Sequence, residues 1–359
     1  MEKHKKQLTL LGIWNQLPVN VWAWVSDIST AQLKRLTGRD LGIFCYLKDD
    51  LDYECFVRKD TDLLKEDLDK LSPSEQRDYV QKITDDYYEK SKQLEKEMVD
   101  ADRLDVLALD NESLAGVIEK LGEVWSTVTI QIWYAVLLDI WYPSPSDKSS
   151  LKKIIAPARD HCGHLHEESD KIQHRLNVEA SKRTGVSERE ITFMVQPEIV
   201  SALRGKVFSK AEVKSRLELC VMSNHSGTFS IHGGVDAESV MEGFSVPKAG
   251  PKKEGPLKGM PASRGKVKGN AHVILLDKEF PEFKEGEILV SLQTMVHYTP
   301  IMKKASAILT EFGGLTSHAA IVSRELGKPA VVGISGLIST IKTGDKLEVD
   351  ADKGIIKIL

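Results

Sequence analysis

A short stretch near residue 250 divides this chain into two regions of different composition. The twelve residues from Ser245 to Pro256 include three prolines, two glycines and only one strongly apolar side chain. Because such a segment cannot bury itself, it is typical of an exposed linker between folded domains. We therefore predict an N-terminal region over residues 1–244, a flexible linker over residues 245–257 and a separate domain over residues 258–359.

Composition and charge exclude several classes of protein. With 41% hydrophobic and 28% charged residues, the chain resembles an ordinary globular protein rather than a disordered one. A formal net charge of −4 lacks the basic excess of a nucleic-acid binder, so we expect no nucleic-acid partner. The apolar run from Ile130 to Trp141 is too short to span a bilayer, so we expect no membrane segment. The four cysteines form no Cys-x-x-Cys pair, which favours reduced thiols and a cytoplasmic location.

The N-terminal region has mainly helical patterns. Ser72-Pro73-Ser74-Glu75 matches a capping box with proline at the first helical position, and apolar residues follow it at helical spacing. A second helix is expected from Asn111 into the tryptophan-rich segment that ends at Trp141. Short β-like runs such as 42–47 predict a small sheet in the first 60 residues. The predicted fold class is therefore mixed, with a mainly α N-terminal region that contains a small β element.

The C-terminal region has a different texture, with short β-rich runs separated by glycine and proline. Such a pattern predicts a compact α/β domain of about one hundred residues. The runs expected to form strands are 266–276, 286–292, 305–310, 330–334 and 346–350.

One segment of this domain combines a strand, a glycine turn, a histidine and a helix. Gly313-Gly314 lets the backbone approach a ligand closely, Thr316 or Ser317 can cap the helix, and His318 lies in its first turn. Free N–H groups and the positive helix end favour a phosphate dianion there and disfavour an imidazolium. A neutral imidazole is a nucleophile, so His318 is predicted to carry phosphate transiently. The phosphate-stabilising residues would be Gly313, Gly314, Thr316, Ser317 and Arg324. The alternative is a histidine that only caps and packs.

The segment 313–333 closely resembles the histidine motif of the phosphoenolpyruvate-utilising enzymes, which include phosphoenolpyruvate synthase, pyruvate phosphate dikinase and rifampicin phosphotransferase. The resemblance extends over residues 258–359 through landmarks such as 259–265 and 286–290. It implies a swivelling phosphohistidine domain in which His318 carries the phosphate. Thr316 matches a position that a regulatory kinase modifies in some dikinases. One loop departs from the family pattern, since Thr294-Met295-Val296-His297 stands where many members have Thr-x-Pro-Asp.

Full-length members of that family carry an ATP-grasp domain that loads the histidine. Residues 1–245 contain no Walker-type loop, and the glycine-rich segment 227–234 is interpreted as a turn. We therefore expect this chain to bind no cofactor itself. ATP and Mg²⁺ are expected on an ATP-grasp partner protein or subunit, with phosphoenolpyruvate as the alternative phosphate donor.

The N-terminal region is less specifically similar to the helical, acceptor-binding region of the rifampicin-phosphotransferase-like branch. By that resemblance it would bind a small-molecule acceptor, and Arg159, His161 and His164 are possible residues of the acceptor site. His161, His164 and Glu168 share one face of a predicted helix, but their spacing is unlike that of a closed zinc site, so no metal is predicted. The sequence thus favours a phosphotransferase component, with a non-catalytic binding or regulatory protein as the alternative.

Overall fold

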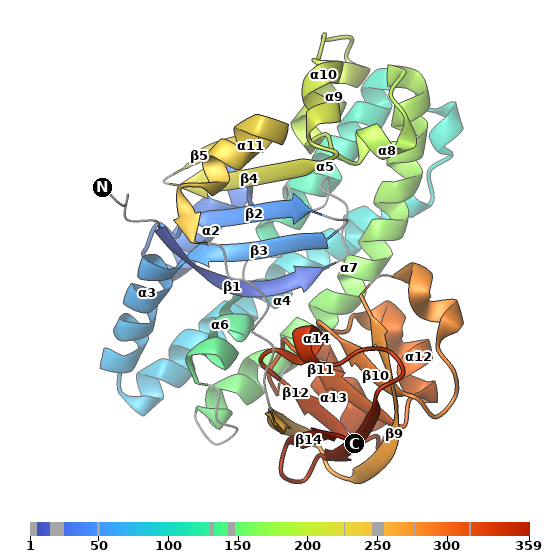
Figure 1. Cartoon of the computed structure of the whole chain (residues 1–359). Coiled ribbons are helices and arrows are strands. Elements are labelled where there is room, and N and C mark those ends of the chain that lie inside the picture. The colour runs from blue at the N-terminus through green and yellow to red at the C-terminus, as the bar shows by residue number, and fades with distance from the viewer. Residues whose placement is uncertain are drawn as a thin grey trace. The chain divides into compact units, whose positions relative to one another are not determined.

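The computed structural model divides the chain into two compact units (Figure 1). The N-terminal unit comprises Met1–Trp133 and His164–Val246, and the C-terminal unit comprises Tyr134–Gly163 and Pro247–Leu359. The structure describes residues 6–14, 25–48, 51–128, 133–142, 148–225, 227–245, 255–275, 277–315 and 317–359. Most of the predicted linker, residues 246–254, lies outside the described residues.

A mostly antiparallel sheet forms one part of the N-terminal unit. Its described strands have the order β5-β4-β2-β3-β1-β6, in which only the β1–β6 pair is parallel. Its strands are β1 (Lys6–Trp14), β2 (Ile43–Lys48), β3 (Leu51–Val57), β4 (Leu219–His225), β5 (Thr228–Gly233) and β6 (Phe244–Ser245). The turn predicted over 227–234 is wrong for most of that segment, because pairing with β4 makes it strand β5. Gly227 alone keeps the turn role, at a φ of +76°.

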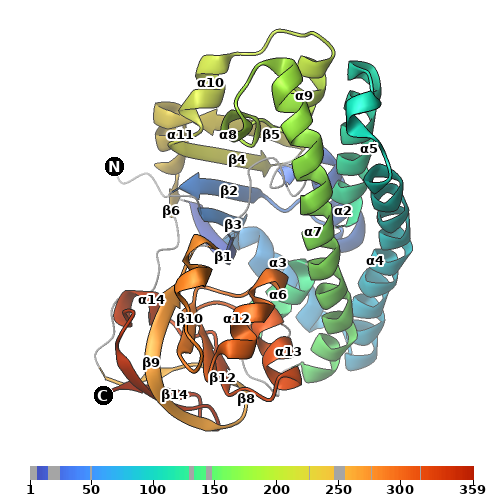
Figure 2. The same cartoon turned by 90° about the vertical axis from the view of Figure 1, so that its right-hand side faces the viewer.

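Helices form the rest of this unit, as the sequence predicted. Helix α4 (Pro73–Asp102) begins with the expected capping box, since the Ser72 side chain accepts from the Glu75 N–H and the Glu75 carboxylate accepts from the Ser72 N–H. It packs along α5 (Asn111–Val128), which in turn packs along α9 (Gln196–Leu203) (Figure 2). The remaining helices are α2 (Asp27–Thr37), α3 (Arg58–Lys70), α8 (Glu188–Ile191), α10 (Lys210–Ser215), α11 (Gly234–Met241) and the 3-10 turn η1 (Val106–Ala108).

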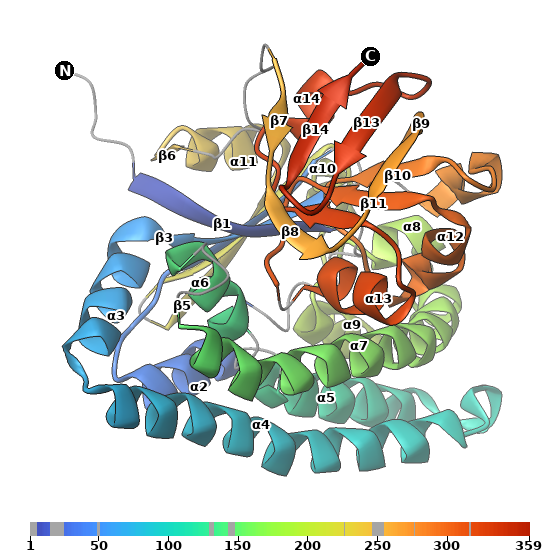
Figure 3. The same ribbon diagram turned by 90° about the horizontal axis from the view of Figure 1, so that it is seen from below.

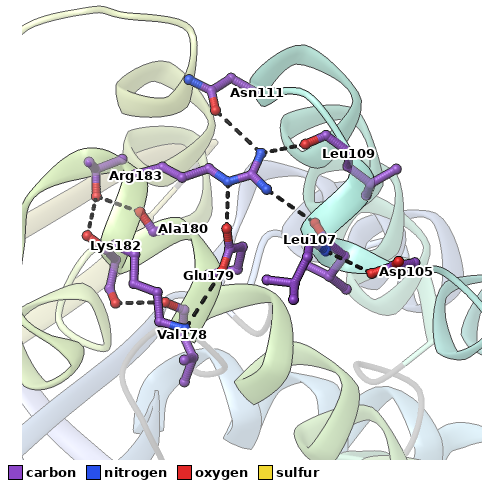
Figure 4. A network of polar contacts seen from close by, with 12 residues as sticks. Asp105, Leu107, Leu109, Asn111, Val178, Glu179, Ala180, Lys182 and Arg183 are labelled. Carbon is purple, nitrogen blue, oxygen red and sulfur yellow. Dashed lines mark hydrogen bonds and ion pairs between the residues drawn. The ribbon is translucent and has the colours of Figure 1, made fainter.

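Long helix α7 (Ser149–Thr184) is attached to the α4–α5 connection by an arginine near its end. The Arg183 guanidinium donates to the carbonyls of Val106 and Leu109 at 3.1 and 2.7 Å, and its Nε donates to Glu179 Oε1 at 2.8 Å (Figure 4). A planar guanidinium suits this use because its five donors point in fixed directions. The contact therefore joins segments that lie more than 70 residues apart in sequence.

The stretch Asn111–Trp141, which contains α5 and α6 (Trp133–Trp141), has the length and apolar composition of a membrane span. Within the protein, however, 79% of its most apolar window is buried. Core helices of globular proteins share this property, and Trp125 at 1% exposure is an example of such packing.

The C-terminal unit contains a larger sheet whose centre is parallel (Figure 3). Its described strands have the order β7-β14-β13-β9-β10-β11-β12-β8, and the β9-β10-β11-β12 run is parallel. The strands are β7 (Leu257–Lys258), β8 (Met260–Ser263), β9 (Lys266–Ile274), β10 (Ile288–Ser291), β11 (Ala307–Thr310), β12 (Ala330–Val332), β13 (Lys346–Asp350) and β14 (Ile355–Ile358). The five predicted strand runs are each found here.

Period-two alternation along these strands gives the sheet two apolar faces. On β11, Ala307 and Leu309 point into one core with α14 (Leu337–Thr340), and Ile308 points into the other. The second core is covered by α12 (Thr299–Lys304) and α13 (His318–Glu325). The 3-10 turns are η3 (Asp277–Glu282) and η4 (Val296–Tyr298). The predicted fold class, a mainly helical N-terminal region followed by an α/β domain, is confirmed, although the N-terminal sheet is larger than the predicted small element because strands β4 to β6 join it from residues 219–245.

Candidate functional site

The chemistry-bearing residues of the C-terminal unit follow the carboxyl ends of two neighbouring parallel strands. Strand β10 ends at Ser291 and leads to Thr294, and strand β11 ends at Thr310 and leads to the loop before His318. Carboxyl ends of parallel strands meet at one edge of the sheet, where loops from adjacent strands converge. This topology explains why residues 24 positions apart come into contact.

Helix α13 begins at His318, as its first residue. Ser317 is the N-cap: its hydroxyl accepts from the Ala320 N–H at 3.4 Å and donates to the Gly314 carbonyl at 2.7 Å. Gly313 has a φ of +108°, a conformation that a side chain would strain. The glycine pair therefore allows a tight loop that folds back over Ser317 and presents His318 at the helix end.

The His318 ring is oriented by a threonine in the loop that follows the neighbouring strand β10. Thr294 Oγ1 and His318 Nδ1 are 2.9 Å apart, and the Thr294 side chain is buried. Which of the two atoms donates depends on the tautomer of the ring. When Nδ1 carries the proton and donates to Thr294, the lone pair lies on Nε2. In the sequence Thr294 stands out only as part of a divergent loop, because nothing local indicates which strand end faces His318.

Of the other predicted phosphate-stabilising residues, the structure describes Arg324 but not Thr316. Arg324 is exposed and its Nη2 donates to the Leu315 carbonyl at 3.0 Å, so it braces the loop from the far turn of α13. Thr316 lies outside the described residues.

Buried Glu311, just after β11, accepts from the N–H groups of Gly336 and Ile338 at 3.2 and 2.8 Å and thereby fixes the strand end to the start of α14.

The predicted acceptor residues lie on α7. Arg159 pairs with Asp139 of α6, with Nη1 and Oδ2 3.3 Å apart. Lys152, also on α7, is 3.3 Å from the other carboxylate oxygen of Asp139. Burial is the largest influence on Arg159 and lowers the pKa of its guanidinium, although Asp139 acts to raise it. His161 is half-buried and His164 is exposed, one turn further along the helix.

The Asp139 carboxyl group lies directly against the histidine loop. A Cβ atom added at Gly314 would overlap Asp139 Cγ and Oδ2, so only glycine fits at this position. Arg159 is thereby brought to the loop through a carboxylate that both residues contact. Neither Asp139 nor Lys152 was predicted as a site residue, because no local pattern indicates that α6 reaches the histidine loop.

Two buried polar atoms lie close to the same strand ends. Thr310 Oγ1 and Gln293 Nε2 are buried and have no hydrogen-bond partner within the part of the chain that the structure describes. Thr310 is fully buried, and its hydroxyl lies 4.0 Å from the position of a Cβ built on Gly313. Buried polar atoms are normally satisfied, so these two stand out among the described residues. Across the described ranges, no group of three or more His, Cys, Asp or Glu residues is arranged to hold a metal ion.

Comparison with known proteins concerns the C-terminal region. The family model described as "PEP-utilising enzyme, mobile domain" matches residues 283–354. A probable phosphoenolpyruvate synthase of Staphylothermus marinus is 51% identical over 102 residues, which is 28% of this chain and 12% of that protein. The phosphoenolpyruvate synthase of Helicobacter pylori is 36% identical over 137 residues, which is 38% of this chain and 17% of that protein. The match thus spans less than a fifth of the length of either relative.

Solved structures give weaker likenesses. Aconitase X of Thermococcus kodakaraensis in its holo-form aligns with 29% of this chain and 98% of its own, at 24% identity and a TM-score of 0.24. A solution structure of Enzyme I (nEIt) aligns with 78% of this chain and 79% of its own, at 18% identity and a TM-score of 0.21.

Proposed function

Because this chain is a member of the phosphoenolpyruvate-utilising enzyme family through its mobile domain, we propose that it is a phosphotransferase component in which His318 carries the phosphoryl group. The observation that carries this proposal is the placement of His318 as the first residue of α13, with Nδ1 held 2.9 Å from Thr294 Oγ1. A ring oriented at one nitrogen presents the other one for attack.

The transfer has two balanced halves. In the first, the Nε2 lone pair attacks phosphorus, the bond from phosphorus to the donor's leaving oxygen breaks, and that oxygen keeps the electron pair. In the second, a hydroxyl oxygen of the acceptor attacks phosphorus and the P–N bond breaks with its electron pair returning to imidazole. The hydroxyl proton passes to a base, for which His161 or His164 of α7 is proposed.

The loop around His318 supports the charge of the carried group. N–H groups at the start of α13 and the Gly313-Gly314 backbone suit phosphate oxygens. Ser317 holds the loop through its bonds to Gly314 and Ala320. Thr316 and Arg324 remain proposed phosphate-stabilising residues, Arg324 by way of the Leu315 carbonyl that it holds.

We further propose that the phosphoryl donor is ATP bound with Mg²⁺ on an ATP-grasp partner, or phosphoenolpyruvate, and that the acceptor is a small molecule. The curated relatives named phosphoenolpyruvate synthase extend far beyond the matched segment. The ATP-grasp partner would supply the nucleotide-binding function that we do not find in this chain. The proposed location is the cytoplasm, in keeping with the sparse cysteines.

Intact mass spectrometry tests the carrier role. The purified chain is incubated with phosphoenolpyruvate, or with ATP, Mg²⁺ and an ATP-grasp partner, and its mass is compared with those of His318→Ala and His297→Ala. His297 is a matched control, because it lies in the same unit and stacks on Phe280 with ring centroids 5.8 Å apart. One acid-labile, base-stable phosphate is expected on the wild type and on His297→Ala, and none on His318→Ala. A label that persists in His318→Ala would refute the proposal.

A further inference from the structure

Asp139, Lys152 and Arg159 form a largely buried ion cluster with one more cation than anion, which a contribution to stability alone does not explain. The Lys152, Asp139 and Arg159 side chains are only 4%, 6% and 19% exposed. Two cations share one carboxylate, with each N–O distance 3.3 Å. Replacing such a buried group by apolar residues is often neutral or stabilising, so its presence calls for another purpose.

The position of the cluster indicates what that purpose is. Asp139 Oδ2, the oxygen paired with Arg159, lies against Gly314 in the loop that leads into His318. The Gly314 carbonyl accepts from both the N–H and the hydroxyl of Ser317, so the loop is only one tight turn long between the two sites. Two cations and the carboxylate that they share therefore lie at the loop that leads into His318, the residue proposed to carry a phosphate dianion.

The chemistry of the cations and of their surroundings fits phosphate. An arginine side chain presents a planar fork that binds phosphate through two hydrogen bonds, and a lysine ammonium adds a point charge. The unpartnered, buried Thr310 Oγ1 and Gln293 Nε2 offer further donors at the same strand ends. These two atoms do not belong to the ion cluster, and each can donate a hydrogen bond to an anion.

We propose that Asp139 is a place-holding anion: it neutralises Lys152 and Arg159 while His318 is unmodified, and the phosphoryl group on His318 displaces it from those cations. This inference rests on the proposed function, because it concerns the phosphorylated form of His318. It makes Lys152 and Arg159 positioning residues for the phosphoryl group. It also makes the α6–α7 segment sensitive to whether His318 is loaded.

Opposite effects on labelling separate this role from a structural one. A merely structural cluster is damaged by the loss of any member, so every variant would label more poorly. Competition between Asp139 and phosphate instead predicts that removing the anion helps phosphate and that removing a cation hinders it.

The experiment uses potassium phosphoramidate, which phosphorylates histidine without a partner protein. The imidazole nitrogen attacks the phosphorus of phosphoramidate that is protonated on nitrogen, the P–N bond breaks with its electron pair going to that nitrogen, and ammonia leaves. The labelling rate and the half-life of the adduct are measured by intact mass on the full chain, and the label on His318→Ala, which reports the other histidines, is subtracted. Asp139→Asn is expected to raise the labelling rate at least threefold, and Arg159→Gln to lower it at least fivefold with a shorter half-life. Arg159→Lys should recover part of the loss.

Neighbouring lysines provide the matched control. Lys152→Gln should lower labelling, whereas Lys153→Gln, at the exposed adjacent position of α7, should leave it unchanged. If Asp139→Asn does not fold, Asp139→Leu removes the same anion with a side chain of similar volume and should likewise raise the labelling rate. The inference is overturned if the labelling rate changes in the same direction in Asp139→Asn and Arg159→Gln, or if it changes in neither variant. Wild-type protein that takes no label at His318 overturns the proposed function instead.

Discussion

The two units of this protein place their charged side chains differently. In the N-terminal unit, arginines join segments that are far apart in sequence, as Arg183 does at η1 and as Arg216 does at Phe193 and Glu198. In the C-terminal unit the buried pairs of Asp139 with Lys152 and Arg159 lie against the loop that leads into His318, and the Ser317 hydroxyl holds the same loop. Charged side chains thus fasten separate segments in one unit, whereas in the other they lie beside the candidate site.

The two sheets differ in a related way. The N-terminal sheet is antiparallel apart from the β1–β6 pair, so its successive strand ends alternate between opposite edges. The parallel β9-β10-β11-β12 strands instead bring their carboxyl ends to one edge, where Thr294 and His318 meet. This difference explains why the candidate site is found in the C-terminal unit. The following changes test how far the two units depend on different forces.

The largest expected effect is in the apolar core of the parallel sheet. Leu309 on β11 is fully buried, so Leu309→Ala should destabilise the C-terminal unit by about 3 kcal/mol through lost burial and a residual cavity. Urea denaturation followed by circular dichroism measures this change. Ile358→Ala, at 46% exposure on β14, is the control and should have little effect. An equal loss in both variants would show that the parallel sheet does not depend on its core in this way.

A smaller effect is expected from the polar ties of the N-terminal unit. Arg216→Gln removes two bonds to Glu198, at 2.7 and 2.8 Å, and one to the Phe193 carbonyl. We expect a loss of about 2 kcal/mol, less than for a fully buried pair because Glu198 is partly exposed. Arg204→Gln, which breaks exposed pairs with Glu112 and Glu119, should change the urea midpoint little. Equal midpoints for the two variants would contradict the importance of the buried tie.

The start of α4 should contribute less again. Ser72→Ala removes the hydroxyl that accepts from the Glu75 N–H, and loss of an N-cap costs about 1 kcal/mol. Ser74→Ala, at the second residue of the same helix, is the control. The Ser74 hydroxyl contacts the Ser72 hydroxyl and caps no backbone N–H in the part of the chain that the structure describes. Thermal unfolding of the two variants compares them. A lower melting temperature for Ser74→Ala than for Ser72→Ala would argue against the cap.

The smallest expected effect is a pH dependence in the C-terminal unit. Burial raises the pKa of Glu287, but the Lys284 N–H and the His272 ring, 2.8 Å away, outweigh it and leave that pKa below its ordinary value of 4.5. A depressed pKa contributes stability above the unfolded-state value, and this contribution is lost as the pH falls through the folded-state value. Glu287→Gln should therefore flatten the fall in melting temperature below about pH 5. Parallel acid-melting curves for variant and wild type would contradict this assignment.

The local sequence alone determined the structural elements that depend on interactions between residues a few positions apart. The capping box at Ser72 and Glu75 and the strand, glycine turn and helix around His318 were predicted and are present, and of the two predicted caps, Thr316 or Ser317, the structure has Ser317. Their geometry depends on backbone propensities and on hydrogen bonds between residues three or four apart. The same local origin explains why the histidine motif could be identified without a structure.

Tertiary structure decided which of these elements meet. Thr294 reaches His318 only because β10 and β11 are parallel neighbours, and Asp139 reaches Gly314 across 175 positions of sequence. Strand β4 likewise pairs with β2 over a sequence separation that no local pattern reports, and β5 is added to the sheet through its hairpin with β4. Strand order and helix docking depend on burial summed over the whole unit, so the partners of a residue cannot be read from its neighbours in sequence.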